Sequence, residues 1–515
     1  MLDLEMLRHF ALALALLGVG LLLVDFWLHR VGASDRWKRT RDALLAALGL
    51  VAALSWWDPL LLPRAQNPPG LHWVSLHDSF HYYMGPKYFR ELGYFDLYEC
   101  VVAAEVELGA GLEVTRRVYR DLATNEAIPA GRMRAMGQDC DRRFSPARWS
   151  LFVHDVDWFR QRVPHWGTTL QDWGYNATPV WNALGSALID ERPASEAQLG
   201  WLTLLDVALI WACFGLIAWG FGWRTACVAS IFWGTHAANA YAWTGGSILR
   251  HAWLLWSVAG LCLLRRQKPL AAGAAITTAA CLTIFPGFLA VGIGFKMVGN
   301  WFSERRLFLS PAHRRLLLGA GIALAILLPA AFLAGGTIST WQDFATNSRI
   351  DSEPSPNNMG LPTVLSYDPA LSLRASELVD PRGAAAAWTA AHKQTLRSRW
   401  PLWTALVAAW LWISFGAARR HPDWVAALLG LGFVVFAFEL SCYYYAFMLL
   451  FGLLWPRHRS IGIALCGLAA ASLWLGDHWR DDEELYTRLS LLTVAFLAYS
   501  GIVLRIARPE SEAAE

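Results

Sequence analysis

Long, uninterrupted apolar segments recur along this 515-residue chain and constrain its fold more than any other feature. Each is close to the roughly 20 residues that an α-helix needs to cross the hydrocarbon core of a bilayer. Only 17% of the residues are charged, against roughly 25% in soluble domains. We therefore predict an all-α polytopic membrane protein with about 13 transmembrane helices. The segments lie near 8–28, 43–62, 201–222, 225–243, 247–264, 269–285, 286–302, 316–336, 401–418, 424–441, 443–456, 460–476 and 487–504.

Short basic loops orient these spans, because Lys and Arg are retained on the cytoplasmic side. Residues 29–42 are rich in Arg and are assigned to the inside. With the spans above, the later basic clusters fall on the same side, provided that Pro286 divides 269–302 into two helices. The chain is then organised as an N-terminal pair of spans, a first extracytoplasmic loop, a central bundle, a second extracytoplasmic loop, and a C-terminal bundle with a short tail. Their bounds are 1–62, 63–199, 200–336, 337–400 and 401–515.

The two extracytoplasmic loops are long enough to be structured. Helices are expected over 79–92 and 101–120 in the first loop, and an Ala-rich helix near 383–396 in the second. Cys100 and Cys140 both fall in the first loop. They could form a disulfide if that loop faces an oxidising compartment, or remain reduced, and the sequence leaves both alternatives open.

The stretch 77–98 opens the first loop just after the second apolar segment and gathers a carboxylate, two histidines, a lysine and several tyrosines. Asp78 is the candidate catalytic base. The alternative is that it only caps the helix that follows, since Asp is favoured at that position. His77 and His81 can tune or share its proton, or make ordinary polar contacts at the interface. Lys87 is a further substrate-binding candidate.

A second group of candidates lies in 172–181, where aromatic rings alternate with hydrogen-bonding side chains. Aromatic rings pack on the apolar face of a pyranose, while polar side chains bind its hydroxyls. Sugar recognition could therefore use the ring of Tyr175 and the polar side chains of Asp172 and Asn176. The alternative is an ordinary turn before the next span. Asp155, earlier in the loop, is interpreted as a surface or capping residue.

A third group surrounds Arg250 and His251, at the predicted outer end of the span 247–264. An ionisable residue at the membrane predicts a functional site, and the donors of Arg suit a phosphate. The alternative is that Arg250 reaches to the lipid headgroups. His236, late in the preceding span, is placed at the same level, and Glu439 lies at an outer end too.

Three short patches resemble the GT-C superfamily of membrane glycosyltransferases. Asp78 followed by YYMGPKYFRELGYFDLY (82–98) is similar to the start of the first external loop in that superfamily, above all in polyprenol-phosphate-mannose-dependent mannosyltransferases. Residues 175–179 resemble a Tyr/Pro motif before the next span. Trp341 with 357–361 resembles a motif of the later external loop, which adds Asn358 to the candidates. Family members usually have one span before the catalytic loop, whereas two are expected here.

The resemblance implies a GT-C-like fold in a plasma or inner membrane, with the active site on the extracytoplasmic side. It implies inverting transfer of a hexose such as mannose from a polyprenyl-phosphate donor to a glycan, lipid or protein acceptor. Asp78 would take the proton of the acceptor hydroxyl, and Arg250 would hold the departing phosphate. No cofactor is implied, although a divalent metal at Asp78 is compatible with the residues, and no basic run suggests nucleic acid as a partner.

Two other functions compete with the transferase. A transporter or flippase of a lipid-linked glycan would distribute polar residues through its spans as a path, whereas the candidates here gather at the outer ends. A non-catalytic scaffold would use the external loops to bind partners. The transferase hypothesis makes one geometric demand, which is that Asp78 and Arg250 converge on a common cavity.

Overall fold

The computed structural model describes residues 4–506 apart from 33, 59–66, 68–69, 190, 305–308 and 380–382. The end of the predicted span 43–62 and the C-terminal tail lie outside these residues. The described chain is almost entirely helical. Six of its helices are long and apolar enough to cross a membrane, so the chain is an all-α integral membrane protein. They are α1 (Leu4–Val31), α11 (Glu196–Phe221), α17 (Pro311–Leu333), α22 (Trp400–Ala418), α24 (Arg459–His478) and α25 (Asp482–Ile506).

The other apolar segments form elements that are shorter or, like the 22-residue α2, less apolar, and the total of about 13 spans stays a prediction. These elements are α2 (Asp35–Trp56), α12 (Trp223–Thr235), α14 (Ala252–Arg265), α15 (Pro269–Leu282), α16 (Phe288–Glu304), α23 (Asp423–Ala437) and the 3₁₀ helix η6 (Cys442–Leu454). The predicted break at Pro286 is confirmed, because η4 (Phe285–Gly287) separates α15 from α16. The segment 225–243 is not one helix. Helix α12 ends at Thr235, and the chain continues as η3 (Ala237–Asn239) and α13 (Tyr241–Thr244).

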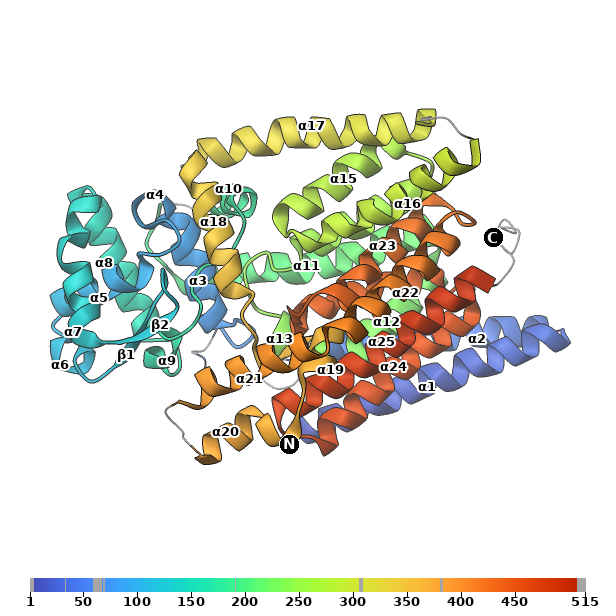
Figure 1. Ribbon diagram of the computed structural model, residues 1–515, viewed down its shortest axis with the longest axis horizontal. Helices are drawn as coiled ribbons and strands as arrows, with labels where there is room; N and C mark the ends of the chain where they lie inside the picture. Colours follow the sequence, from blue (N-terminus) through green and yellow to red (C-terminus); the bar gives the residue numbers. More distant parts are fainter. Residues whose placement is uncertain are drawn as a thin grey trace.

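The apolar helices lie side by side along the longest axis of the molecule, and residues 76–169 form a separate body at one end, here called the lobe (Figure 1). The lobe contains α3 (Leu76–Lys87), α4 (Phe89–Leu92), α5 (Leu97–Glu107), α6 (Gly111–Val114), β1 (Val118–Asp121), β2 (Glu126–Pro129), α7 (Ala130–Met136), η2 (Gly137–Arg143), α8 (Pro146–Arg160) and α9 (Trp166–Thr169). The helix predicted over 79–92 is confirmed as α3 and α4. The segment 101–120, predicted as one helix, is divided: α5 ends at Glu107, Gly109 adopts a positive φ of 81°, and after the short α6 the chain continues into the antiparallel pair β1–β2.

The second polar region returns to the same end of the bundle. After α17, helix α18 (Ile338–Asp351) descends between the lobe and the bundle (Figure 1). It is followed by β3 (Asn358–Met359), α19 (Leu361–Ser366), η5 (Pro369–Leu371), α20 (Leu373–Val379) and α21 (Ala384–Ser398). β3 pairs with β4 (Leu440–Ser441), which precedes η6. The predicted Ala-rich helix is confirmed as α21.

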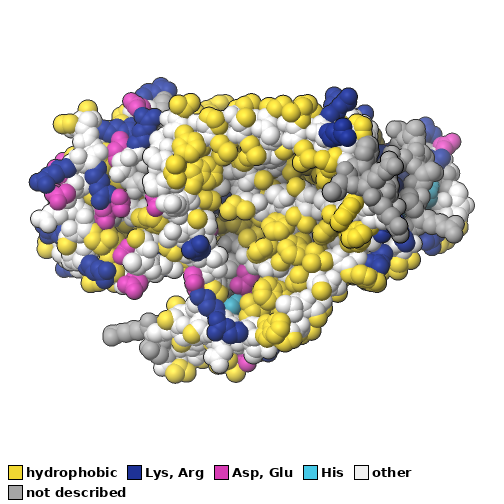
Figure 2. Space-filling view, turned by 45° about the horizontal axis from the view of Figure 1, so that its top comes forward, with side chains coloured by type: hydrophobic (Ala, Val, Ile, Leu, Met, Phe, Trp, Pro, Cys, Tyr) yellow, Lys and Arg dark blue, Asp and Glu magenta, His cyan; other side chains and the backbone are white. Residues whose placement is uncertain are grey.

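The surface separates apolar from charged regions as a bilayer requires. In Figure 2 hydrophobic side chains cover the middle of the molecule, while charged side chains gather on the lobe and at the opposite end. Within the lobe, Cys100 of α5 and Cys140 of η2 are joined by a disulfide, which decides between the two alternatives left open above.

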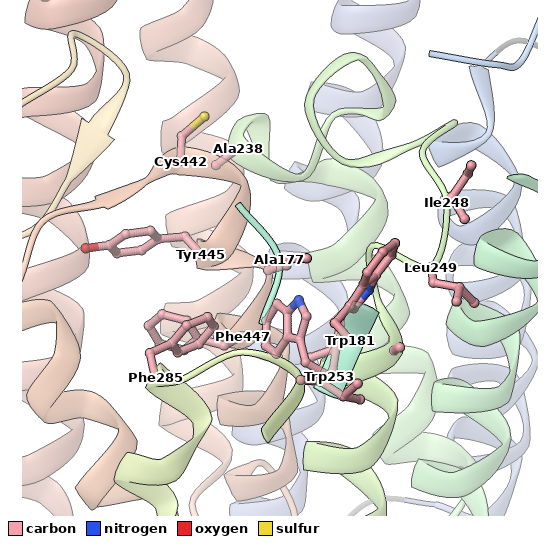
Figure 3. Close-up of a cluster of buried hydrophobic side chains, with 14 of the residues drawn as sticks. Ala177, Trp181, Ala238, Ile248, Leu249, Trp253, Phe285, Cys442, Tyr445 and Phe447 are labelled. Carbon is pink, nitrogen blue, oxygen red and sulfur yellow. The ribbon is translucent and has the colours of Figure 1, made fainter. Parts of the chain in front are cut away.

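An aromatic cluster joins the lobe side of the molecule to the bundle (Figure 3). Trp181 of α10 (Pro179–Leu188), Trp253 of α14, Phe285 of η4 and Phe447 of η6 are drawn together there from segments far apart in the sequence. The rings of Trp253 and Phe285 lie 4.8 Å apart, and those of Phe285 and Phe447 lie 5.8 Å apart. Such large buried rings stabilise strongly, and edge-on contacts orient them. Three of the four also form part of the wall of a cavity.

Candidate functional site

A cavity of about 720 Å³ lies where the lobe, α18 and the bundle meet. Its wall has a polar part and an apolar part. The polar part includes Ser75, His77, Asp78, His81, Tyr82, Asp172, Asn176, Ser247, Arg250, Asp351, Glu353, Asn358, Glu439, Ser441 and Tyr443. The apolar part includes Trp181, Trp253, Leu282, Ile284, Phe285, Phe288, Phe344, Val434 and Phe438. A pocket of this size and mixed lining is typical of ligand sites.

Asp78 and Arg250 meet in this cavity, as the transferase hypothesis demands. Arg250 Nη2 lies 2.9 Å from Asp78 Oδ2. The contact depends on Gly246, whose carbonyl accepts a 2.8 Å hydrogen bond from the backbone N–H of Ser75. A Cβ on Gly246 would lie 2.3 Å from the carbonyl oxygen of Trp73, and its φ is +77°. Only glycine therefore lets the loop before α14 pack so closely against the start of α3.

Asp78 keeps one carboxylate oxygen available. Its Oδ2 forms the ion pair with Arg250 and accepts a hydrogen bond from the hydroxyl of Ser75 at 2.7 Å. Among the described residues none donates to Oδ1, and the side chain is 29% exposed. Burial opposes the negative charge, but Arg250, His77 and Ser75 outweigh it and hold the pKa of Asp78 below its usual value. The aspartate is thus ionised at neutral pH, it lines the cavity, and no described residue donates to its Oδ1.

Arg250 is fixed by groups other than Asp78. Its Nη1 donates to the carbonyl of Trp243, and its guanidinium lies 4.8 Å from the centre of the Tyr443 ring. Both contacts hold the planar group at the cavity wall without neutralising it. Among the residues that the structure describes, Asp78 is the carboxylate paired with this guanidinium.

His77 and His81 lie one turn apart on α3 and face Asp172. His77 Nε2 lies 2.9 Å from Asp172 Oδ2, and His77 Nδ1 lies 3.0 Å from Thr169 Oγ1. His81 Nε2 lies 2.7 Å from the Tyr98 hydroxyl. Burial lowers the pKa of His81 to about 4. Burial also opposes the charged form of His77, but the hydrogen bond to Asp172 outweighs burial, and the pKa of His77 is raised. Asp172 is itself held well below the usual pKa of an aspartate, because the histidines outweigh its burial.

Asn176 lines the cavity together with an acid that the sequence did not indicate. The Tyr82 hydroxyl donates to Asn176 Oδ1 at 2.6 Å. Asp351, at the end of α18, lies on the same wall, where enclosure raises its pKa to about 6 although Asn176 opposes the shift. Among the acids of the cavity wall, Asp78 and Asp351 therefore have pKa values shifted in opposite directions. No motif surrounds Asp351, and only the placement of α18 brings it to the site.

The remaining candidates divide into those at the cavity and those behind its wall. Asn358 lines the cavity. Tyr175 is buried beneath it, where its hydroxyl donates to Asn182 at 3.1 Å. His251 is buried next to Arg250 and lies 2.7 Å from Asp206. His236 is buried in the bundle, where its ring lies 4.8 Å from that of Phe232.

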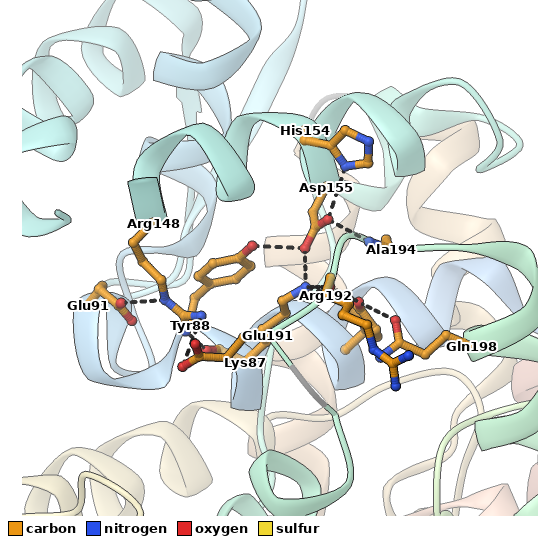
Figure 4. A network of polar contacts seen from close by, with 11 residues as sticks. Lys87, Tyr88, Glu91, Arg148, His154, Asp155, Glu191, Arg192, Ala194 and Gln198 are labelled. Atoms are coloured by element: carbon orange, nitrogen blue, oxygen red, sulfur yellow. Dashed lines mark hydrogen bonds and ion pairs between the residues drawn. The ribbon is translucent and has the colours of Figure 1, made fainter. Parts of the chain in front are cut away.

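Lys87 lies outside the cavity, in the closed network drawn in Figure 4. Its Nζ lies 2.7 Å from Asp155 Oδ2, and both side chains are almost completely buried. The Tyr88 hydroxyl donates to the same oxygen at 2.8 Å. The interpretation of Asp155 as a surface or capping residue is therefore wrong. The sequence around Asp155 gives no sign of a buried partner 68 positions away, so its burial could not be predicted.

Glu439 and Tyr443 also line the cavity. Glu439 Oε1 lies 2.9 Å from His392 Nε2 of α21 and accepts a 3.2 Å hydrogen bond from Thr363. The second polar region is thus tied to the same site as the lobe.

Comparison with known proteins gives no match among family models, curated proteins or solved structures. The resemblance to the GT-C superfamily stays a prediction, and the function is argued from the geometry of the cavity.

Proposed function

We propose that this protein is a GT-C-like membrane glycosyltransferase that moves a hexose such as mannose from a polyprenyl-phosphate donor to an acceptor hydroxyl, with inversion. The proposal rests on one observation above all: an ionised carboxylate with a free oxygen lies beside a fixed guanidinium in a cavity at the edge of an apolar bundle. A base and a phosphate-binding cation are the two groups that such a transfer needs.

The mixed lining of the cavity supports a donor with a polar head and a lipid tail. Ile284 and Phe438 belong to the wall, and 59% and 44% of their surface is exposed. An apolar wall that continues onto an exposed apolar surface suits a prenyl chain, because each buried methylene contributes about 0.8 kcal/mol. The charged head would lie toward Arg250.

We place the cavity on the extracytoplasmic side and assign about 13 spans to the chain. Support comes from the distribution of charge, because the basic connection between α1 and α2 lies at the end of the molecule opposite the lobe (Figure 1). Basic connections of this kind are retained in the cytoplasm. The disulfide in the lobe fits an oxidising compartment.

In the proposed reaction, the acceptor oxygen attacks the anomeric carbon from the side opposite the phosphate. The bond from that carbon to the acceptor oxygen forms as the bond to the phosphate oxygen breaks. Asp78 Oδ1 receives the acceptor proton, and the polyprenyl phosphate leaves with the bonding pair, beside Arg250. A phosphate that pairs with the guanidinium would offset its positive charge and so raise the pKa of Asp78, which makes Asp78 a stronger base when the donor is bound.

The test is Asp78→Asn, measured as transfer from radiolabelled polyprenyl-phosphate sugars to endogenous acceptors in membranes. Removal of a general base lowers the rate by about 100- to 10,000-fold, while expression and membrane insertion should persist because Asn keeps the shape of the side chain. Asp157→Asn, in a half-exposed pair with Arg160 outside the cavity, serves as the matched control and should transfer normally.

Undiminished transfer by Asp78→Asn would remove this residue from the mechanism. Movement of a lipid-linked glycan across reconstituted vesicles that survives the same substitution would favour a transporter or flippase. Purified protein that neither transfers sugar nor binds polyprenyl phosphate would favour a scaffold.

A further inference from the structure

We propose that His77, His81 and Asp172 form a binding site for a divalent transition-metal ion at the wall of the cavity. His77 and His81 are four residues apart on α3, so both rings lie on one face of the helix. One ligand atom from each histidine and one from Asp172 all lie within 4.8 Å of one another. All three side chains line the cavity.

The hydrogen bonds behind His81 set which of its nitrogens is free. The Tyr98 hydroxyl lies 2.9 Å from the carbonyl of Thr169 and 3.2 Å from that of Asp172, and it donates its single hydrogen to one of these two acceptors. This arrangement favours the tautomer in which His81 Nε2 carries the proton and donates to the hydroxyl. In that tautomer Nδ1 keeps its lone pair, 3.9 Å from Asp172 Oδ2. This separation is too long for a hydrogen bond, but it is short enough for two ligands of one ion to close around it.

His77 is oriented in the same way. Thr169 Oγ1 lies 3.0 Å from Nδ1, so it can accept the proton of that nitrogen and leave Nε2 as a ligand. His77 Nε2 and Asp172 Oδ2 lie 2.9 Å apart and share a proton when no metal is bound. A metal ion would take the place of this proton. Hydrogen bonds that fix the ring and tautomer of a histidine are typical of metal ligands.

The donor set indicates the class of ion. Two imidazole nitrogens and one carboxylate suit Zn²⁺, Mn²⁺ or Co²⁺, whereas Mg²⁺ and Ca²⁺ prefer oxygen ligands alone. Three protein ligands leave at least one position open toward the cavity. The other three-residue group of this type among the described residues, Glu99 with Cys100 and Cys140, is not available to a metal because its cysteines are disulfide-bonded.

The use of this ion rests on the proposed function. The neighbouring residue on α3 is Asp78, which pairs with Arg250. A phosphate oxygen of the donor could therefore fill the open position while the guanidinium binds another oxygen of the same phosphate. Together the two cations would offset the charge that develops on the leaving group.

The experiment measures metal binding alone, without donor or acceptor. Purified, tag-free, full-length protein in detergent is stripped with a chelator and titrated with Zn²⁺, Mn²⁺ and Co²⁺. Bound ion per chain is then measured by mass spectrometry, and the Co²⁺ form by its visible absorption. We expect one ion per chain whose affinity falls more than about tenfold in His77→Gln and in Asp172→Asn. His154→Gln, in a half-exposed histidine of α8 outside the cavity, should bind as the unmodified chain does.

Thermal melting and gel filtration of each variant show whether it is folded, and Asp172→Asn keeps the test decisive if His77→Gln does not fold. The proposal is overturned if the unmodified protein binds none of the three ions. It is also overturned if both variants bind the ions as tightly as the unmodified protein does. These outcomes are independent of transfer, because a protein that binds the ion but transfers no sugar refutes the proposed function and leaves the metal site standing.

Discussion

The two ends of helix α3 each carry one member of an ion pair, and the two pairs differ in a way that separates structure from chemistry. At the start of the helix, Asp78 pairs with Arg250, and their side chains are 29% and 14% exposed. At its end, Lys87 pairs with Asp155, and their side chains are 1% and 0% exposed. Both pairs join α3 to a distant segment of the chain, and both have ordinary short N···O distances.

The difference lies in how completely the carboxylates are used. Asp155 accepts at Oδ2 from Lys87 and Tyr88 and at Oδ1 from the backbone N–H of Ala194. Asp78 places both of its contacts on Oδ2, and no described residue donates to its Oδ1. A buried network with every acceptor occupied fixes a fold, whereas an oxygen that faces a cavity can take up a proton. Completeness of hydrogen bonding thus distinguishes the two pairs better than residue type does.

The largest effect on stability is expected for Lys87→Met. The substitution leaves Asp155 buried without its cation, and breaking a buried ion pair in this way costs about 3–5 kcal/mol. Thermal unfolding in detergent, followed by tryptophan fluorescence, should show a marked loss of stability. Lys393→Met is the matched control, because its pair with Glu353 is exposed and such pairs contribute at most about 1 kcal/mol.

Asp78→Asn in the same assay sharpens the contrast. Asp78 borders the cavity, where water can solvate Arg250 once the carboxylate charge is removed, so this variant should unfold much closer to the unmodified protein than Lys87→Met does. Equal destabilisation by the two substitutions would contradict the division into a structural pair and a functional pair.

The next largest effect is expected for Arg250→Gln on transfer. Loss of the guanidinium removes a charged partner of the donor phosphate, and kcat/KM for the lipid donor should fall about 10- to 100-fold. Arg250→Lys should recover part of this loss, because it restores the charge but not the fork of donors. Arg488→Gln, in an exposed pair with Glu484 outside the cavity, is the control. Unchanged kcat/KM in Arg250→Gln would exclude this residue from donor binding.

The sequence predicted the helices better than it predicted the contacts. Apolar length located nearly every bundle element, and Pro286 correctly marked the break between α15 and α16, because these features act locally. Asp78 and Arg250 were expected to converge, since the predicted topology put both at the outer ends of spans, and the structure brings them into contact.

Partnerships between distant segments could not be predicted in the same way. Lys87 and Asp78 look alike in the sequence, as polar residues of one motif, and only the folded lobe shows that Lys87 meets Asp155. Asp351 reaches the cavity because α18 descends beside the lobe, which no periodicity indicates. The grouping of Asp172 with His77 and His81 likewise depends on a contact across 95 positions.

The smallest of these effects concerns Glu99, an acid in the otherwise well-paired lobe. Burial and the nearby Asp96 raise the pKa of Glu99 to about 7, although Arg143 opposes the shift. The folded protein therefore holds a proton that the unfolded chain releases near pH 4.5, so the contribution of Glu99 to stability should fall as pH rises from about 4.5 to about 7 and then level off. Glu99→Gln cannot titrate but still accepts from Arg143, and should be more stable than the unmodified protein by about 1 kcal/mol at pH 8.

Melting temperatures at pH 5 and pH 8 give this comparison directly. The difference between the two pH values should be smaller in Glu99→Gln than in the unmodified protein, and Asp139→Asn, an exposed acid paired with Arg142 in the same lobe, should leave it unchanged. If Glu99→Gln keeps the full pH dependence, Glu99 is as well compensated as Asp155. Glu99 would then belong with Asp155, as a lobe carboxylate whose negative charge is fully stabilised by its partners, in contrast to the carboxylates of the cavity.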